Sequence, residues 1–174
     1  NDTGLVLWYD LGDESGVGAD PINKTPDLSG NGNTGSLGNS SIKTAPLANS
    51  THCVIGSCLN FSTVNGSQMH VIANPVSNFP TSAITAALWL RANSGDDGTV
   101  LSYAVSGTHN EFRLEQVNNI KVLFNGQTLS TGVSVADGLW HHLAVTWRSS
   151  DGLALLYKDG ALAYGDFIES GSPI

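Results

Sequence analysis

The best candidate for acid–base chemistry in this sequence is the run Glu111-Phe112-Arg113-Leu114-Glu115. Alternate residues of a β-strand point to the same face, so both Glu side chains and Arg113 would share one face. Two carboxylates near one another could serve as the nucleophile and the acid of a glycoside hydrolase. Arg113 stands between them, however, and would hold both carboxylates ionised, whereas a general acid must carry a proton. The pattern indicates an exposed ion-pair ladder, and we predict that the chain is not an enzyme.

The other groups that could bind metal or act as nucleophiles are His141-His142 and the two cysteines. Adjacent strand residues point to opposite faces, so the two imidazoles cannot share one ion, and we expect packed or hydrogen-bonded rings. Cys53 and Cys58, even with His52, supply too few ligands for a structural zinc site and no orienting acid for a nucleophile. Because they lie five residues apart, a local disulfide is favoured over two free thiols.

A cation site is predicted in the run Asp27-Leu28-Ser29-Gly30-Asn31-Gly32-Asn33-Thr34-Gly35. Such a run is poor at forming a helix or strand, but it can fold back and aim carbonyl and side-chain oxygens at an ion. Oxygen ligands of this kind suit Ca²⁺. Asp27 and Asn31 are therefore candidate metal ligands, and calcium is the candidate cofactor. The alternative is an ordinary surface loop.

The composition limits the classes of partner. The chain has 174 residues, enough for one domain with a hydrophobic core. Its net charge is −8 with only seven Lys and Arg, which argues against binding to nucleic acid or to an anionic membrane surface. No run approaches the roughly 18 apolar residues of a membrane span, so membrane insertion is not expected. Calcium and neutral sugars remain as natural partners of an acidic surface.

Six Asn-x-Ser/Thr sequons occur, all within the first 67 residues. We interpret this clustering as the mark of an extracellular, glycosylated protein. The best candidates for glycosylation are Asn23, Asn39 and Asn49, because their surroundings resemble loops. Asn60, by contrast, falls within a predicted strand.

The candidate residues are distributed over many short strands. From Leu139 the odd positions are apolar or aromatic as far as Trp147, apart from His141, an alternation typical of a half-buried strand. Asp151-Gly152, Asp159-Gly160 and Asn125-Gly126 favour tight hairpins. We predict an all-β, two-sheet antiparallel β-sandwich with no helix. Strands are expected at residues 4–11, 36–37, 58–63, 69–73, 82–92, 98–104, 111–117, 119–124, 127–130, 139–147, 153–157 and 161–164.

Several of these segments resemble a known family. The run Trp140-His141-His142-Leu143-Ala144-Val145-Thr146-Trp147, followed by its two Asp-Gly turns, resembles pentraxin and laminin-G-like domains. Ala87-Leu88-Trp89-Leu90-Arg91, Leu101-Ser102-Tyr103-Ala104-Val105 and Asn110-Glu111-Phe112 follow the pentraxin order. The Asp27–Gly35 run and Gly56-Ser57-Cys58-Leu59-Asn60-Phe61 resemble the opening of laminin-G-like domains. The resemblance implies a sandwich of the jelly-roll, concanavalin A-like type.

The resemblance also carries functional expectations. Pentraxins bind ligands through calcium, and Asn110 matches one calcium ligand of that family, whereas His109 replaces the residue before it. The family's acidic loop and last strands would follow Ile174. Residues 1–174 are thus expected to be a single laminin-G/pentraxin-like domain lacking its C-terminal strands, which other domains or chains would supply.

Together these features predict a non-catalytic recognition or adhesion module of a larger extracellular glycoprotein, with glycans or extracellular proteins as ligands. The alternative is a purely structural building block of a fibre or multi-subunit assembly. The four Trp side chains, at positions 8, 89, 140 and 147, could stack on sugars. Each lies in an apolar run, however, so core packing is expected for all of them.

Overall fold

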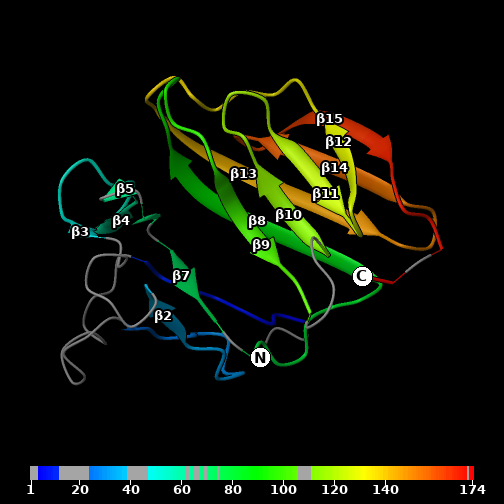
Figure 1. The fold of residues 1–174 in the computed structure, drawn as a ribbon, viewed down its shortest axis with the longest axis horizontal. Helices are drawn as coiled ribbons and strands as arrows, with labels where there is room; N and C mark the ends of the chain where they lie inside the picture. Colours follow the sequence, from blue (N-terminus) through cyan, green and yellow to red (C-terminus); the bar gives the residue numbers. More distant parts are fainter. Residues whose placement is uncertain are drawn as a thin grey trace. The chain divides into compact units, whose positions relative to one another are not determined.

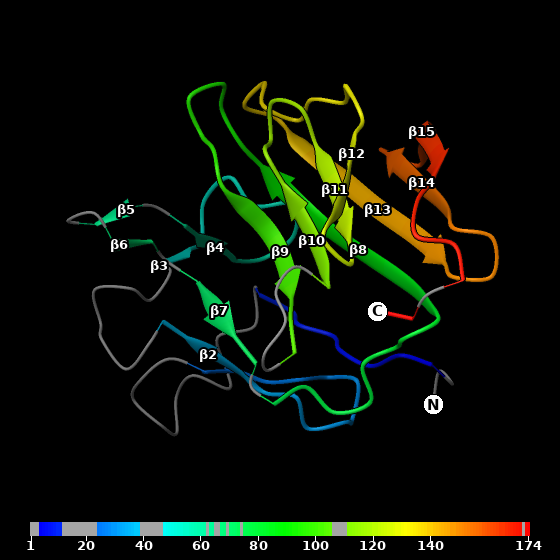
Figure 2. The same cartoon turned by 45° about the vertical axis from the view of Figure 1, so that its right-hand side comes forward.

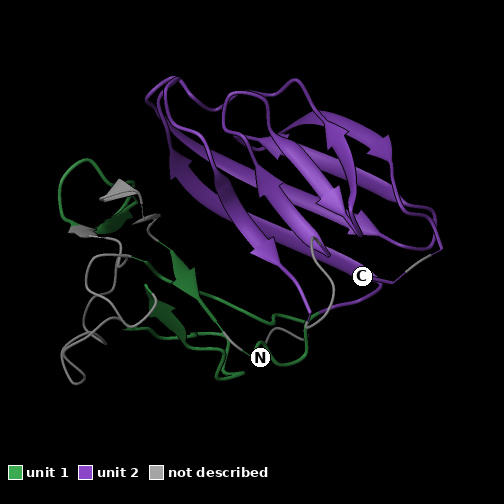
Figure 3. Ribbon diagram, viewed as in Figure 1, with its two compact units in different colours: residues 1–79 green, residues 80–174 purple. Residues whose placement is uncertain are grey.

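The computed structural model describes residues 4–11, 24–38, 47–61, 63–64, 67–68, 70–73, 75–105, 111–171 and 173–174. These residues form strands and turns without a helix (Figure 1). Within these ranges nothing has the length and apolar character of a membrane-crossing helix. The chain divides into two compact units, residues 1–79 and 80–174 (Figure 3). Each unit is described by itself.

Unit 2 contains two four-stranded antiparallel sheets, which lie one over the other in both Figure 1 and Figure 2. The first sheet has the order β12-β11-β10-β9 and the second β15-β14-β13-β8. The strands of the first sheet are β9 (Thr99–Tyr103), β10 (Phe112–Glu115), β11 (Lys121–Phe124) and β12 (Gln127–Ser130). Those of the second are β8 (Ala83–Arg91), β13 (Trp140–Arg148), β14 (Leu153–Lys158) and β15 (Ala161–Phe167).

The core of unit 2 lies between these two sheets. Alternation along β13 buries Leu143, Val145 and Trp147 on one face. The ring of Trp147 stacks on Phe124 of β11, with 4.7 Å between ring centroids and 19° between ring planes. Phe124 stacks in turn on Phe112 of β10. Because this column joins one sheet to the other, unit 2 is a β-sandwich, and the predicted all-β fold class is confirmed.

The predicted hairpin turns are also present. Asn125 and Gly126, which connect β11 to β12, have φ angles of 49° and 82°. Asp159 and Gly160, which connect β14 to β15, have φ angles of 53° and 81°. Two successive positive φ angles define the type I′ turn, whose twist matches that of the flanking strands.

Unit 1 is built from shorter pieces. A three-stranded sheet has the order β1-β2-β7, formed by Lys24–Thr25, Gly35–Leu37 and Val71–Ile72. Two small hairpins accompany it: β3 (Leu47–Asn49) pairs with β4 (Cys58–Asn60), and β5 (Thr63–Val64) pairs with β6 (Ser67–Gln68). Gly35 is required in β2, because a Cβ there would lie 2.7 Å from the side chain of Val71 and 2.8 Å from that of Thr25.

The prediction of a first strand at residues 4–11 is wrong: 5–10 lie in an irregular segment outside every sheet. Side chains of the following turn take the backbone groups that a neighbouring strand would otherwise bind. Asp27 Oδ1 accepts a hydrogen bond from Trp8 N, and Asn31 Nδ2 donates one to Leu5 O. The prediction of one strand within residues 12–50 was also too sparse, since that region contains β1, β2 and β3.

Candidate functional site

The two carboxylates considered for catalysis lie in different surroundings. Along β10, Phe112 and Leu114 point into the core of unit 2. Arg113 lies on the opposite face and places its Nε 3.0 Å from Glu115 Oε2. Of the predicted exposed ion-pair ladder, the pair between Arg113 and Glu115 is therefore present, but both side chains are partly buried and Glu111 is not exposed. Glu111 precedes β10, is buried, and accepts a hydrogen bond from Asn125 N at its backbone oxygen.

The Asp27 turn organises unit 1 through hydrogen bonds. Asp27 Oδ1 accepts from Trp8 N at 3.0 Å and from Ser29 N at 2.9 Å, while Oδ2 accepts from Asn33 N at 2.9 Å. Burial opposes ionisation of Asp27, but the hydrogen bonds from Ser29 and two further backbone amides outweigh it and hold its pKa below the usual 3.8. The carboxylate thus accepts three backbone hydrogen bonds from within unit 1.

The neighbouring Asn side chains also bind backbone groups of unit 1. Asn31 donates its amide to Leu5 O at 2.8 Å, and buried Asn33 donates to Val6 O at 2.9 Å and accepts from Ser77 N at 2.7 Å. The described residues contain no group of three or more His, Cys, Asp or Glu that could hold a metal ion. Cation binding at Asp27 and Asn31 stays a prediction. Asn110, the third candidate, lies outside the described residues.

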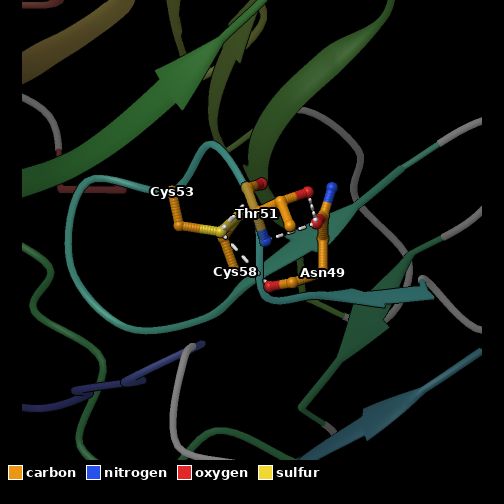
Figure 4. The surroundings of a disulfide bond; sticks show 4 residues. All are labelled: Asn49, Thr51, Cys53 and Cys58. Atoms are coloured by element: carbon orange, nitrogen blue, oxygen red, sulfur yellow. Dashed lines mark hydrogen bonds between the residues drawn. A yellow bond between two sulfur atoms is a disulfide. The ribbon is translucent and has the colours of Figure 1, made fainter.

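Cys53 and Cys58 form the predicted disulfide, which closes a loop between β3 and β4 (Figure 4). Asn49, a candidate for glycosylation, lies beside this bond at the end of β3, where a loop had been expected. Its Oδ1 accepts hydrogen bonds from Thr51 N at 2.8 Å and from Thr51 Oγ1 at 2.9 Å. The other two candidates, Asn23 and Asn39, lie outside the described residues. Glycosylation at all three positions stays a prediction.

The adjacent histidines point to opposite faces of β13, as predicted. His141 is only 7% exposed and contacts two carboxylates: its Nδ1 lies 2.7 Å from Asp159 Oδ2, and its Nε2 lies 3.0 Å from Asp137 Oδ1. Burial alone would lower the pKa of His141, but the hydrogen bonds to Asp159 and Asp137 raise it above the ordinary 6.5. We call these three residues the His141 clamp. It ties the β14–β15 turn to the loop before β13.

His142 lies on the outer face of the second sheet, the face that points away from the first sheet. It pairs in register with Trp89 of β8, and the two rings are 5.3 Å apart with a tilt of 60°. His142 N donates to Asp159 Oδ1 at 2.9 Å, and Asp159 N donates to His142 O at 2.8 Å. These contacts place Trp89 of β8, His142 of β13 and Asp159 of the β14–β15 turn side by side.

These three side chains and Gly160 line an open depression of about 430 Å³. We call it the Trp89 depression. Trp89 is 53% exposed there, although its apolar surroundings had predicted core packing. The expectation is correct for Trp147, which is buried, and wrong for Trp89 and for Trp8 in unit 1, which is also 53% exposed. The exposure of Trp89 could have been predicted from the alternation of β8, because its apolar residues share one face and Trp89 lies on the other. These apolar residues are Ile84, Ala86, Leu88 and Leu90.

Comparison with known proteins agrees with this architecture. A laminin-G family model, described as the concanavalin A-like lectin/glucanases superfamily, matches residues 65–173. The match covers more than half of the chain, so the chain belongs to this superfamily, and the predicted resemblance is confirmed.

Among curated proteins the chain is similar to pentraxins. It is 38% identical over 96 residues to neuronal pentraxin-2 of Homo sapiens, a match that covers 53% of this chain and 22% of that protein. It is 36% identical over 97 residues to the neuronal pentraxin receptor of Rattus norvegicus, covering 53% of this chain and 20% of the receptor. The matched region thus spans about a fifth of the length of these relatives.

A solved structure supports the fold alone. Domain 4 of AbnA, a GH43 extracellular arabinanase from Geobacillus stearothermophilus, in complex with arabinotriose, aligns with a TM-score of 0.53 at 16% identity. The alignment covers 84% of this chain and 73% of that domain.

Proposed function

We propose that this chain is a non-catalytic recognition module of an extracellular glycoprotein, whose ligands are glycans or extracellular proteins. The observation that carries the proposal is Trp89, a large aromatic side chain that is 53% exposed on the outer face of a regular sheet. An exposed Trp beside polar groups is typical of binding surfaces, because it offers contact area at a low cost in conformational entropy.

Two observations favour binding over catalysis. Glu115, the only carboxylate of its strand β10, forms an ion pair with Arg113. The pentraxin relatives match over 53% of the chain, and the arabinanase domain of similar fold is in complex with an oligosaccharide, arabinotriose. A sandwich with loops and an open sheet face can hold a ligand without a catalytic pair.

The extracellular location is part of the same proposal. The Cys53–Cys58 disulfide would persist in an oxidising compartment, and disulfides are rare in reducing ones. Glycosylation at Asn23, Asn39 or Asn49 would fit that location. Calcium is a candidate cofactor, although in this arrangement Asp27 already accepts three backbone hydrogen bonds, so no contact is assigned to the ion.

A glycan array probed with the protein, once with added calcium and once with a chelator, tests this proposal. Binding that a soluble competing sugar removes would support glycan recognition, and the difference between the two conditions would measure the role of calcium. A blank array, together with obligate assembly in light-scattering measurements, would refute glycan recognition and favour the structural alternative.

A further inference from the structure

We propose that the Trp89 depression is a subsite for one neutral sugar ring, with Trp89 as the stacking platform and Asp159 and His142 as its hydrogen-bonding partners. This inference rests on the proposed function and deepens it by naming a site and a ligand class. The volume of the depression, about 430 Å³, lies at the small end of the range for ligand pockets and has room for one sugar ring.

The aromatic platform is the first part of the argument. A sugar ring presents C–H groups on one face, and these pack well on the negative face of an aromatic ring. Trp89 stands on the nine-residue strand β8, which pairs with β13 along its whole length. Its neighbours in the row across the outer face are His142 and then the β14–β15 turn, so the indole is held from one side and open to solvent on the other.

The polar partners are the second part. Asp159 uses one carboxylate oxygen to accept from His142 N and the other to contact His141 Nδ1. A carboxylate offers about four acceptor sites, so both oxygens can still accept a hydrogen bond from a sugar hydroxyl. Asp159 is already oriented by these two contacts, and binding therefore would cost little further ordering.

The charge of the site favours a neutral ligand. The lining residues of the Trp89 depression include one carboxylate, that of Asp159, and no Lys or Arg. Lys158 directly precedes Asp159 and is the cation that acts on this carboxylate, but its Nζ donates to Ser134 O and it does not line the depression. The chain as a whole carries −8. A sugar acid would place a second carboxylate near Asp159 without a cation in the lining, whereas a neutral ring would not.

His141 is a positioning residue for this subsite. It contacts Asp159 from the core side and also Asp137, but it does not line the depression. Its loss would leave the Trp89 platform intact and would loosen the orientation of the Asp159 carboxylate. A His141→Gln variant is therefore expected to weaken binding less than Trp89→Ala does.

The test is to titrate the whole chain with oligosaccharides at neutral pH and to detect their binding by ligand-observed NMR. The ligands are neutral trisaccharides (arabinotriose, cellotriose and maltotriose) and trigalacturonate, an acidic trisaccharide of matched length. At least one neutral trisaccharide should bind, and Trp89→Ala should weaken it roughly tenfold, the factor that corresponds to the upper range of aromatic packing energies. Trp89→Phe should retain part of the affinity. Trp8→Ala, a substitution at an equally exposed Trp in unit 1, should leave it unchanged.

Three outcomes would overturn the subsite: equal binding by Trp89→Ala and the unchanged chain, binding of trigalacturonate as tight as that of the neutral sugars, or no binding of any trisaccharide. The first two leave the proposed function standing, with its ligand site elsewhere, if the glycan array is positive. A blank array would instead refute glycan recognition together with the subsite, and would leave protein ligands or the structural alternative. Unfolding curves of each variant would establish that a loss of binding is not a loss of fold.

Discussion

Replacing Trp147 by Phe tests the aromatic column that joins the two sheets of unit 2. Trp147 is 2% exposed, stacks on Phe124, and donates its indole N–H to Ile168 O at 3.0 Å. A Phe at this position can keep the stacking but not the hydrogen bond. The buried carbonyl of Ile168 would lose its donor, and a small cavity would form where the indole's second ring had been.

The size of the effect follows from these two losses. An unsatisfied buried carbonyl costs about 1–3 kcal/mol, and the lost ring atoms with their cavity add about 1–2 kcal/mol. We expect the free energy of unfolding of unit 2 to fall by about 3 kcal/mol. For a unit of this size, residues 80–174, that corresponds to a drop of roughly 12–24 °C in its melting temperature.

Urea denaturation followed by circular dichroism would measure this change. The matched control is Trp89→Phe, which makes the same replacement on the outer face of the neighbouring strand β8, where the side chain is half exposed. We expect that variant to change stability by less than about 0.5 kcal/mol, the usual size for surface substitutions. Equal losses in the two variants would refute the assignment of Trp147 to the core and Trp89 to the surface.

Three further predictions concern the remaining structural features. Because the folded-state pKa of His141 is raised above 6.5, the His141 clamp should stabilise the fold fully below pH 6.5, and this stabilisation should decline as the pH rises through the folded-state pKa. Unfolding curves between pH 5.5 and 8.5 should show this decline, and His141→Gln should abolish it. Substitution of Cys53 and Cys58 by Ser should lower the free energy of unfolding by about 2 kcal/mol, since the disulfide closes only a short loop. A reducing agent should lower the melting temperature of the unchanged chain as much as the double substitution does, and should leave that of the variant unaltered. Asp27→Ala should lower the free energy of unfolding of unit 1 by about 1–2 kcal/mol, because three backbone amides lose their acceptor. Proteolysis of residues 5–8 should increase in this variant, and unchanged cleavage would contradict the prediction.

The strands of unit 2 were predictable from sequence because their signals are local. Alternation in β13 and β8, and the Asn-Gly and Asp-Gly pairs at residues 125–126 and 159–160, depend on neighbouring residues only. Unit 1 was less predictable. Residues 5–10 have the apolar pattern of a strand, yet their backbone groups are bound by the side chains of a turn about 20 residues later in the chain. No local pattern carries that information.

The candidate site shows the same division. The cysteine spacing was enough to predict the disulfide, and the adjacency of His141 and His142 was enough to predict that they lie on opposite faces. The pair of partners of His141 was not predictable. Asp137 is only four residues away, but Asp159 is eighteen residues away and comes close to His141 only because β13 and β14 form a hairpin. Hydrogen bonds between side chains on different strands depend on the register of the sheet.

The sequence by itself determined that this chain is an all-β protein of the laminin-G and pentraxin type, since short periodic strands, turn pairs and family motifs are properties of the sequence. Alternation in β8 places Trp89 on the face opposite Ile84 and Leu88, but only the tertiary structure shows that this opposite face stays uncovered. Trp147 and Trp89 lie in similar apolar runs, and both were expected in the core. The first sheet packs on one face of the second sheet, which buries Trp147 and leaves Trp89 exposed in the depression that we propose as the binding site.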